Sequence, residues 1–328
     1  MAEWLYEDGI GERRAALIAG DRIVAAQVER DDDGPGVGAV LSARLITHDR
    51  PRRRARIRLD DDTEGWLANP PQTLTQGAAV LTEITRTALR EAGRTKLVQA
   101  LLSAAAAPRA APTLHDRLSA TEHPVRTVSA ASADDVLEAA GWSDLLDIAR
   151  TGIWPFSGGA LAIALTPAMT VIDVDGDLPP RELAKAGAGA AAAAILALGL
   201  TGSIGIDFPT LAGRADRQSI DALLDAALPP PFERTAMNGF GFVQIIRRRM
   251  RPSLCERLQY DDVLSDALAL LRIAERAVGA GMLTLTARAS VIALLQARPQ
   301  WIGTLQVRTG RAAVLTADDS LKGSGHAQ

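Results

Sequence analysis

The chain has 328 residues, of which 47% are hydrophobic and 23% are charged, and its formal net charge at pH 7 is −3. This composition supports a sizeable core divided among two or three units, and the charge gives no sign of a strongly cationic nucleic-acid-binding domain. No apolar run approaches the roughly 20 residues that span a bilayer, and no basic region precedes an apolar stretch at the start, so we expect a soluble cytoplasmic protein without a membrane partner.

The N-terminal residues 1–34 predict a β-hairpin. Apolar β-forming residues at 15–29 flank a two-residue turn, Gly20-Asp21. An acidic loop rich in glycine and proline follows at 30–38.

Residues 35–104 predict a small β-barrel of the OB type. Short apolar segments alternate with turn residues at a density typical of such barrels. The expected strands cover residues 37–46, 55–59, 65–67 and 80–86.

Two arginine clusters are candidate phosphate contacts. Residues 50–58 carry six arginines and residues 247–251 carry four. A strand over 54–59 would place Arg54, Arg56 and Arg58 on one face. The alternative is a solvated face, or ion pairs with the acidic runs at 31–33 and 60–62.

A domain boundary is expected after the barrel, where residues 105–131 read as a linker that begins in an Ala/Pro-rich stretch. Residues 132–256 then predict a mixed α/β domain. Its expected helices cover 132–141, 143–151, 181–198 and 216–227, and its expected strands cover 158–165, 169–174, 204–208 and 241–247.

Three aspartates follow two of these strands and are the most informative feature of the chain. Asp173 and Asp175 end one strand, Asp207 ends the next, and a single Ala-rich helix separates them. A right-handed helical crossover would make the strands parallel and bring their carboxyl ends together. Clustered carboxylates suit Mg2+, which prefers oxygen ligands, whereas the alternative is that each aspartate only caps a turn or helix.

The order of these segments resembles the ribonuclease E/G family, and the resemblance touches nearly the whole chain. It is carried by Gly158-Gly-Ala-Leu-Ala-Ile, Thr170-Val-Ile-Asp-Val, Leu200-Thr-Gly-Ser-Ile-Gly-Ile-Asp-Phe and Gly241-Phe-Val-Gln-Ile-Ile-Arg-Arg-Arg-Met-Arg-Pro-Ser-Leu, with Gly65-Trp66-Leu67 in the barrel. It implies an RNase H-like mixed sheet interrupted by an OB-type RNA-binding barrel, with a small C-terminal α/β domain at 257–328. The N-terminal hairpin at 1–34 would belong to the same RNase H-like domain as the catalytic region 132–256.

The resemblance further implies a Mg2+-dependent endoribonuclease, with Mn2+ as a substitute metal, acting on single-stranded RNA. Trp66 would stack on an unpaired base, although a tryptophan on a barrel is as often part of the core. The implied RNA-binding residues are Arg54, Arg56, Arg58, Trp66, Arg86, Arg247 and Arg249, and the implied catalytic and metal residues are Asp173, Asp175 and Asp207, with Thr210 at the metal.

The chain also departs from the family pattern. The second metal-binding aspartate of the family falls on Thr210, so Asp207 or Asp175 would have to replace it, and Arg56 stands where the family has an aromatic residue. There is too little chain for a segment that recognises a 5′-monophosphate. Cys255 is the single cysteine, so no zinc is expected, and oligomerisation without a zinc link is left open.

Three functions therefore remain open. The first is the endoribonuclease. The second is an RNA-binding protein on the same scaffold whose metal centre is impaired, and the third is a ribosome-associated or protein-interaction factor that contacts no free RNA.

Overall fold

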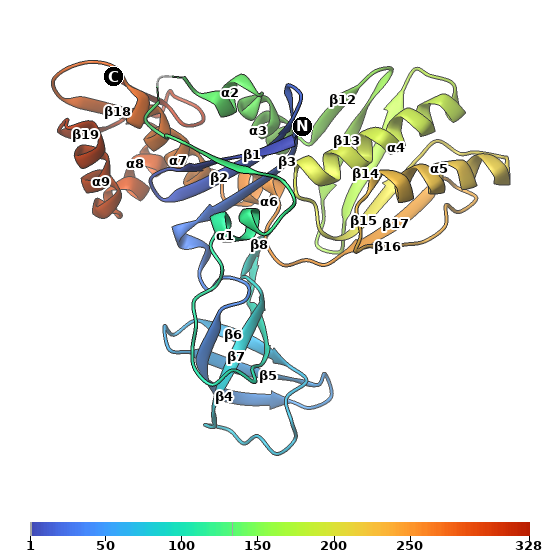
Figure 1. Cartoon of the computed structure of the whole chain (residues 1–328), viewed down its shortest axis with the longest axis horizontal. Coiled ribbons are helices and arrows are strands. Elements are labelled where there is room, and N and C mark those ends of the chain that lie inside the picture. The colour runs from blue at the N-terminus through green and yellow to red at the C-terminus, as the bar shows by residue number, and fades with distance from the viewer. Residues whose placement is uncertain (1, 133) are drawn as a thin grey trace. The chain divides into compact units, whose positions relative to one another are not determined.

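The computed structural model describes residues 2–132 and 134–328 and has a mixed α/β architecture with a closed five-stranded β-barrel and several sheets (Figure 1). The chain forms two compact units. One combines Met1–Asp32, Leu118–Arg150 and Arg257–Gln328, and the other combines Asp33–Arg117 and Thr151–Glu256. Among the described residues, no helix is both long and apolar enough to cross a membrane.

The first unit contains a four-stranded sheet of order β11-β1-β2-β3. Its strands are β1 (Ala2–Asp8), β2 (Glu12–Ala19), β3 (Arg22–Arg30) and β11 (Val125–Val128). The predicted hairpin is confirmed, because β2 and β3 pair antiparallel around Gly20, whose φ is +67°. Glycine tolerates this left-handed conformation without steric cost.

The predicted linker at 105–131 is not structureless along its length. It contains α1 (Leu114–Ser119) and β11, and β11 pairs parallel with β1. The N–H group of Trp4 donates to the carbonyl of Pro124 at 2.8 Å. Pairing of this kind satisfies backbone groups that the edge of β1 would otherwise expose. The Ala/Pro-rich stretch from which the linker was predicted did not indicate it.

The C-terminal segment adds α7 (Asp262–Arg276), α8 (Ala289–Gln296), α9 (Pro299–Thr309) and a small sheet of order β19-β18-β20. The three strands are β18 (Leu283–Ala287), β19 (Ala313–Ala317) and β20 (His326–Ala327). Their core cluster also includes Ile10 from the turn between β1 and β2 of the N-terminal sheet. The C-terminal segment therefore shares a core with the N-terminal strands.

A buried charge network ties α7 to the first sheet. Glu7 accepts hydrogen bonds from Arg14 at 2.7 Å and Arg276 at 2.6 Å, and Glu12 accepts from Arg272 at 2.9 Å. Burial by itself would raise the pKa of Glu7, but the hydrogen bond and charge of Arg14, with the charges of Arg272 and Arg276, outweigh it and hold the pKa at about 2. The pKa of Glu12 is also about 2, since Arg30 and Arg272 outweigh its burial.

The second unit begins with the barrel, whose closed order is β10-β6-β5-β4-β7. The strands are β4 (Val40–Asp49), β5 (Arg54–Leu59), β6 (Glu64–Ala68), β7 (Ala79–Arg86) and β10 (Val98–Leu102), and a short hairpin of β8 (Leu89–Glu91) and β9 (Arg94–Lys96) lies between the last two. Alternate side chains such as Leu45, Ile57, Leu67 and Ile84 fill the interior. The predicted small barrel is confirmed.

A six-stranded sheet of order β12-β13-β14-β15-β17-β16 completes this unit. Its strands are β12 (Ile153–Phe156), β13 (Gly159–Leu165), β14 (Thr170–Gly176), β15 (Gly202–Asp207), β16 (Glu233–Arg234) and β17 (Phe242–Arg247). Helices α4 (Pro180–Ala197) and α5 (Arg214–Ala227) lie on one face (Figure 1). A Cβ on Gly187 of α4 would stand 2.4 Å from Val174, so small residues let this helix approach the sheet.

The remaining helices are α2 (Val136–Ala139), α3 (Trp142–Thr151) and α6 (Leu254–Tyr260), with a 3-10 turn at Asp31–Asp33. The sequence assigned the N-terminal hairpin and residues 132–256 to one domain. The structure instead places the hairpin in the four-stranded sheet and the acidic strands in the six-stranded sheet of the other unit. Strand pairing across distant segments decides this grouping, and local sequence carries no signal for it.

The charge network predicts acid sensitivity of the first unit. The carboxylates of Glu7 and Glu12 have folded-state pKa values of about 2, below the ordinary value of 4.5. Their contribution is therefore fully present above about pH 4.5 and is lost as the pH falls toward 2, on the order of 3 kcal/mol for each group. Denaturant unfolding at pH 5 and pH 3, followed by tryptophan fluorescence, should show this fall.

The matched variants are Glu7→Gln and Glu3→Gln. At neutral pH, Glu7→Gln should cost about 3–5 kcal/mol because it leaves buried guanidinium groups without their counter-charge. Glu3 forms a partly exposed ion pair with Arg126, and its loss should cost less than about 1 kcal/mol. Equal effects of the two substitutions would contradict the role given to the network.

Candidate functional site

The candidate site is built on the parallel pairing of β14 with β15. The register places Asp173 directly beside Asp207. Along β14, Ile172 and Val174 are buried while Asp173 and Asp175 are exposed, because side chains alternate between the two faces of a strand. All three carboxylates therefore lie on the face opposite α4.

Two of these carboxylates stand side by side on neighbouring strands. Neighbouring strands lie about 4.8 Å apart, which sets the backbone separation of Asp173 and Asp207. Asp175 lies two residues further along, and its carboxylate accepts a hydrogen bond from the N–H of Gly176 at 2.9 Å. Within residues 2–132 and 134–328, no group of three or more His, Cys, Asp or Glu side chains is arranged to hold a metal ion.

Thr210 lies in the loop after β15. Its exposed hydroxyl donates to the carbonyl of Phe240 at 3.4 Å. Gly241, with φ +95°, lies against this loop, since a Cβ there would stand 2.2 Å from the carbonyl oxygen of Phe208. Thr210 thus stabilises a loop contact and supplies no negative charge to the carboxylate pair.

Strand β17 adds side chains that sequence reasoning missed. Phe242 is the register partner of Asp207, and Gln244 donates to the hydroxyl of Ser203 at 2.9 Å. Phe240, just before the strand, is 82% exposed. The alternation of β17 was a usable signal, because residues directly opposite each other in an antiparallel pair share a face.

The barrel arginines are largely paired on its outer surface. Arg54 stacks over Trp66, with its guanidinium carbon 3.8 Å from the ring centroid, and the Arg56 guanidinium carbon lies at 5.3 Å. Arg54 also pairs with Asp49 at 3.0 Å, while Arg56 and Arg58 both pair with Glu64. Trp66 is therefore half-buried under cations on the outside of the barrel.

The sequence left open the alternative that these arginines form ion pairs. They do, but with Asp49 and Glu64 and not with the acidic runs at 31–33 and 60–62. Hydrogen bonds from Arg56 and Arg58 lower the pKa of Glu64. In the part of the chain that the structure describes, three nearby arginines form no ion pair: Arg44, Arg50 and Arg53. Arg44 was missed, because it is isolated in sequence and reaches the cluster only by pairing opposite Arg58.

The second arginine cluster does not meet the carboxylates. Arg247 is the last residue of β17 and pairs with Gly202, the first residue of β15, whereas Asp207 is the last residue of β15. Five residues of strand correspond to about 17 Å. Arg247 also shares its face with the buried Val243 and Ile245, opposite the carboxylates, and burial lowers its pKa.

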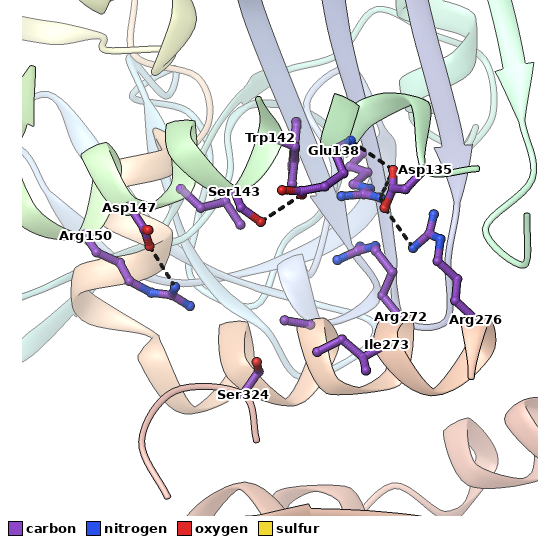
Figure 2. Close-up of a pocket in the computed structure, with 13 residues that line it drawn as sticks. Asp135, Glu138, Trp142, Ser143, Asp147, Arg150, Arg272, Ile273, Arg276 and Ser324 are labelled. Carbon is purple, nitrogen blue, oxygen red and sulfur yellow. Dashed lines mark hydrogen bonds and ion pairs between the residues drawn. The ribbon is translucent and has the colours of Figure 1, made fainter. Parts of the chain in front are cut away.

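The first unit contains a separate pocket of about 340 Å³ between α2, α3 and α7 (Figure 2). Four arginines line it, and each has a carboxylate partner: Arg14 with Glu7, Arg150 with Asp266, Arg272 with Glu12, and Arg276 with Asp135. The acids at its rim are also engaged, as Figure 2 shows for Glu138 with Ser143 and Asp147 with Arg150. All four arginines are compensated, so the pocket carries no surplus positive charge to recognise an anion.

Comparison with known proteins identifies no relative. No protein-family model matches the chain, and no curated protein gives a significant sequence match. The resemblance to the ribonuclease E/G family therefore stays a prediction from the residues themselves.

The carboxylate pair predicts a divalent-cation site that can be measured without any substrate. Asp173→Asn or Asp207→Asn should each raise the dissociation constant for Mn2+ at least about tenfold, because each removes one of two adjacent anionic oxygen donors. Titration followed by Mn2+ electron paramagnetic resonance would measure this dissociation constant. The control is Asp60→Asn in an exposed barrel loop. If both site variants bind Mn2+ as tightly as this control does, the assignment is contradicted.

Proposed function

We propose that this chain is a shortened member of the ribonuclease E/G family that cleaves single-stranded RNA with Mg2+. The observation that carries the proposal is the register of β14 with β15, which sets Asp173 beside Asp207 on an uncovered face of the sheet. Asp175 is the supporting carboxylate on the same face.

A pair of carboxylates fits the needs of Mg2+. This ion keeps several waters and is bound through one or two carboxylates together with substrate phosphates, so a cage of three protein ligands is not required. Mg2+ would polarise the scissile phosphate and lower the pKa of a bound water. Asp173 and Asp207 would orient the ion. Phe242 and Gln244 share the same face and would flank the RNA.

RNA would be held in part by the barrel. Trp66 and the Arg54 guanidinium above it both offer flat surfaces on which an unpaired base can stack. Arg44, Arg50 and Arg53 carry charges that no described carboxylate neutralises, which suits them to phosphate oxygens. The finer fold proposal is an RNase H-like sheet accompanied by this barrel, and it is supported by the antiparallel pair β13–β14 followed by the parallel pair β14–β15 in the sheet that carries the aspartates.

A second candidate is an RNA-binding protein that does not cleave. Thr210 favours it, because its hydroxyl bonds to the Phe240 carbonyl and replaces the carboxylate that the family pattern calls for. The cytoplasmic location and the absence of zinc stay predictions from the sequence, and assembly into a homo-oligomer without a zinc link stays open.

Cleavage of a fluorescent single-stranded RNA in Mg2+ tests the first candidate. Wild type should cut in Mg2+ and not in EDTA, and Asp207→Asn should lower the rate at least about a hundredfold because it removes half of the charge that holds the ion. Thr210→Asp should raise the rate at limiting Mg2+.

The control for the last variant is Thr210→Val, which removes the hydroxyl without adding charge and should leave the rate unchanged. RNA binding without cleavage by wild type would favour the second candidate. If wild type neither binds nor cleaves RNA, both candidates fail and the third function, a protein-interaction factor, takes their place.

The barrel contact can be tested in EDTA, where no cleavage occurs. Trp66→Ala should weaken RNA binding by roughly 1–3 kcal/mol, or about 5- to 150-fold in the dissociation constant, if a base stacks on the ring. Trp66→Phe keeps an aromatic face and should lose much less. Fluorescence anisotropy would measure the RNA affinity of both variants. Equal affinities of Trp66→Ala and Trp66→Phe would exclude stacking of a base on Trp66.

A further inference from the structure

Four buried polar groups without a hydrogen-bond partner gather where β15 begins. They are Arg86 Nε, Arg247 Nη1, Arg249 Nε and Thr201 Oγ1, and each lies out of contact with solvent among the residues that the structure describes. A buried donor left unsatisfied costs about 1–3 kcal/mol. Such groups in one place indicate a missing acceptor.

Gly202, the first residue of β15, connects three of the four residues, and Arg86 is close enough to Arg249 to feel its charge. Gly202 follows Thr201 in the chain and pairs with Arg247. Arg249 packs over it, since a Cβ on Gly202 would stand 3.1 Å from Arg249 Cδ. The end of β7 lies close to the segment that carries Arg249, because the N–H of Thr87 donates to the carbonyl of Met250 at 3.0 Å.

The charge at this place is positive and only partly compensated. Arg249 pairs with Glu91 at 3.4 Å and with Glu256. Neither Arg86 nor Arg247 forms an ion pair with any carboxylate in the described chain. The pKa of Arg86 is lowered by burial and by the charge of Arg249, so each arginine here would gain from an anion.

We propose that Arg86, Arg247, Arg249 and Thr201 form a phosphate-binding site that anchors the RNA backbone away from the point of cleavage. Guanidinium groups match phosphate oxygens in geometry and charge, and a threonine hydroxyl is a common further donor. The identification of the phosphate as part of RNA rests on the proposed function, whereas the phosphate chemistry of the site does not.

The position of the site assigns it a role distinct from that of the carboxylates. It lies at the opposite end of β15 from Asp207, about 17 Å along the strand. It is also reached from the opposite face of the sheet at Arg247. One phosphate cannot contact both places, so the arginines hold a phosphate further along the strand of RNA and set the length of substrate that binds well.

Inorganic phosphate is the first probe, because it tests the site without RNA. Thermal unfolding in phosphate is compared with unfolding in chloride at equal ionic strength for wild type, Arg247→Gln, Thr201→Val and Arg248→Gln. Phosphate stabilises many proteins by exclusion from their surfaces, so the difference between variants is the readout. Phosphate should raise the melting temperature of wild type and of the exposed-residue control Arg248→Gln more than that of the two site variants.

A single-stranded oligonucleotide in EDTA is the second probe. Arg247→Gln should raise its dissociation constant roughly tenfold to a hundredfold and reduce the slope of log affinity against log salt by about 0.7, the amount for one phosphate contact. Arg248→Gln should have a smaller effect on both quantities.

The results separate this proposal from the proposed function. If phosphate stabilises Arg247→Gln and Thr201→Val as much as wild type, the donors are satisfied by water alone and the site is overturned, whether or not the protein cleaves RNA. Equal loss of RNA affinity in Arg247→Gln and Arg248→Gln would also overturn it, since net charge would then explain the effect. Loss of phosphate stabilisation in a protein that cuts no RNA would keep the site and remove the nuclease.

Discussion

The pairing of β14 with β15 is the constraint on which the candidate site depends. Two parallel strands need a crossover, and α4 provides it with small side chains that allow the helix to lie close against Val174. The same close packing buries Ile172 and Val174 and thereby turns the intervening aspartates to the uncovered face. Packing on one side of the sheet thus decides the chemistry on the other.

Charge compensation separates the arginines of this chain into two groups. Most are neutralised at short range, as Arg54 is by Asp49 and Arg56 is by Glu64. Others form no ion pair among the residues that the structure describes, including Arg53 at the barrel turn and Arg247 at the end of β17. A chain with a net charge of −3 can therefore still present local cationic sites, because the field near a phosphate depends on unpaired neighbours more than on the total.

The first unit is organised by buried ion pairs between distant segments. Glu7 and Glu12 from the N-terminal strands meet Arg272 from α7, more than 250 positions later. Each buried charge would be costly alone, and the network is tolerable because the carboxylates and guanidiniums satisfy one another. The same compensation leaves the pocket of this unit, lined by Arg14 and Arg276, with no unpaired arginine for an anionic ligand.

The sequence by itself determined the local elements: the hairpin, the barrel strands, the Ala-rich helix and the outward alternation of Arg54, Arg56 and Arg58, since periodicity and turn residues act over a few positions. It also placed Asp173 and Asp207 at the ends of parallel neighbours. Only the tertiary structure decided which segments share a sheet, that Arg247 lies far from the carboxylates, and which arginines are neutralised. These outcomes depend on strand register and on contacts between residues distant in the chain, for which a single sequence holds no local signal.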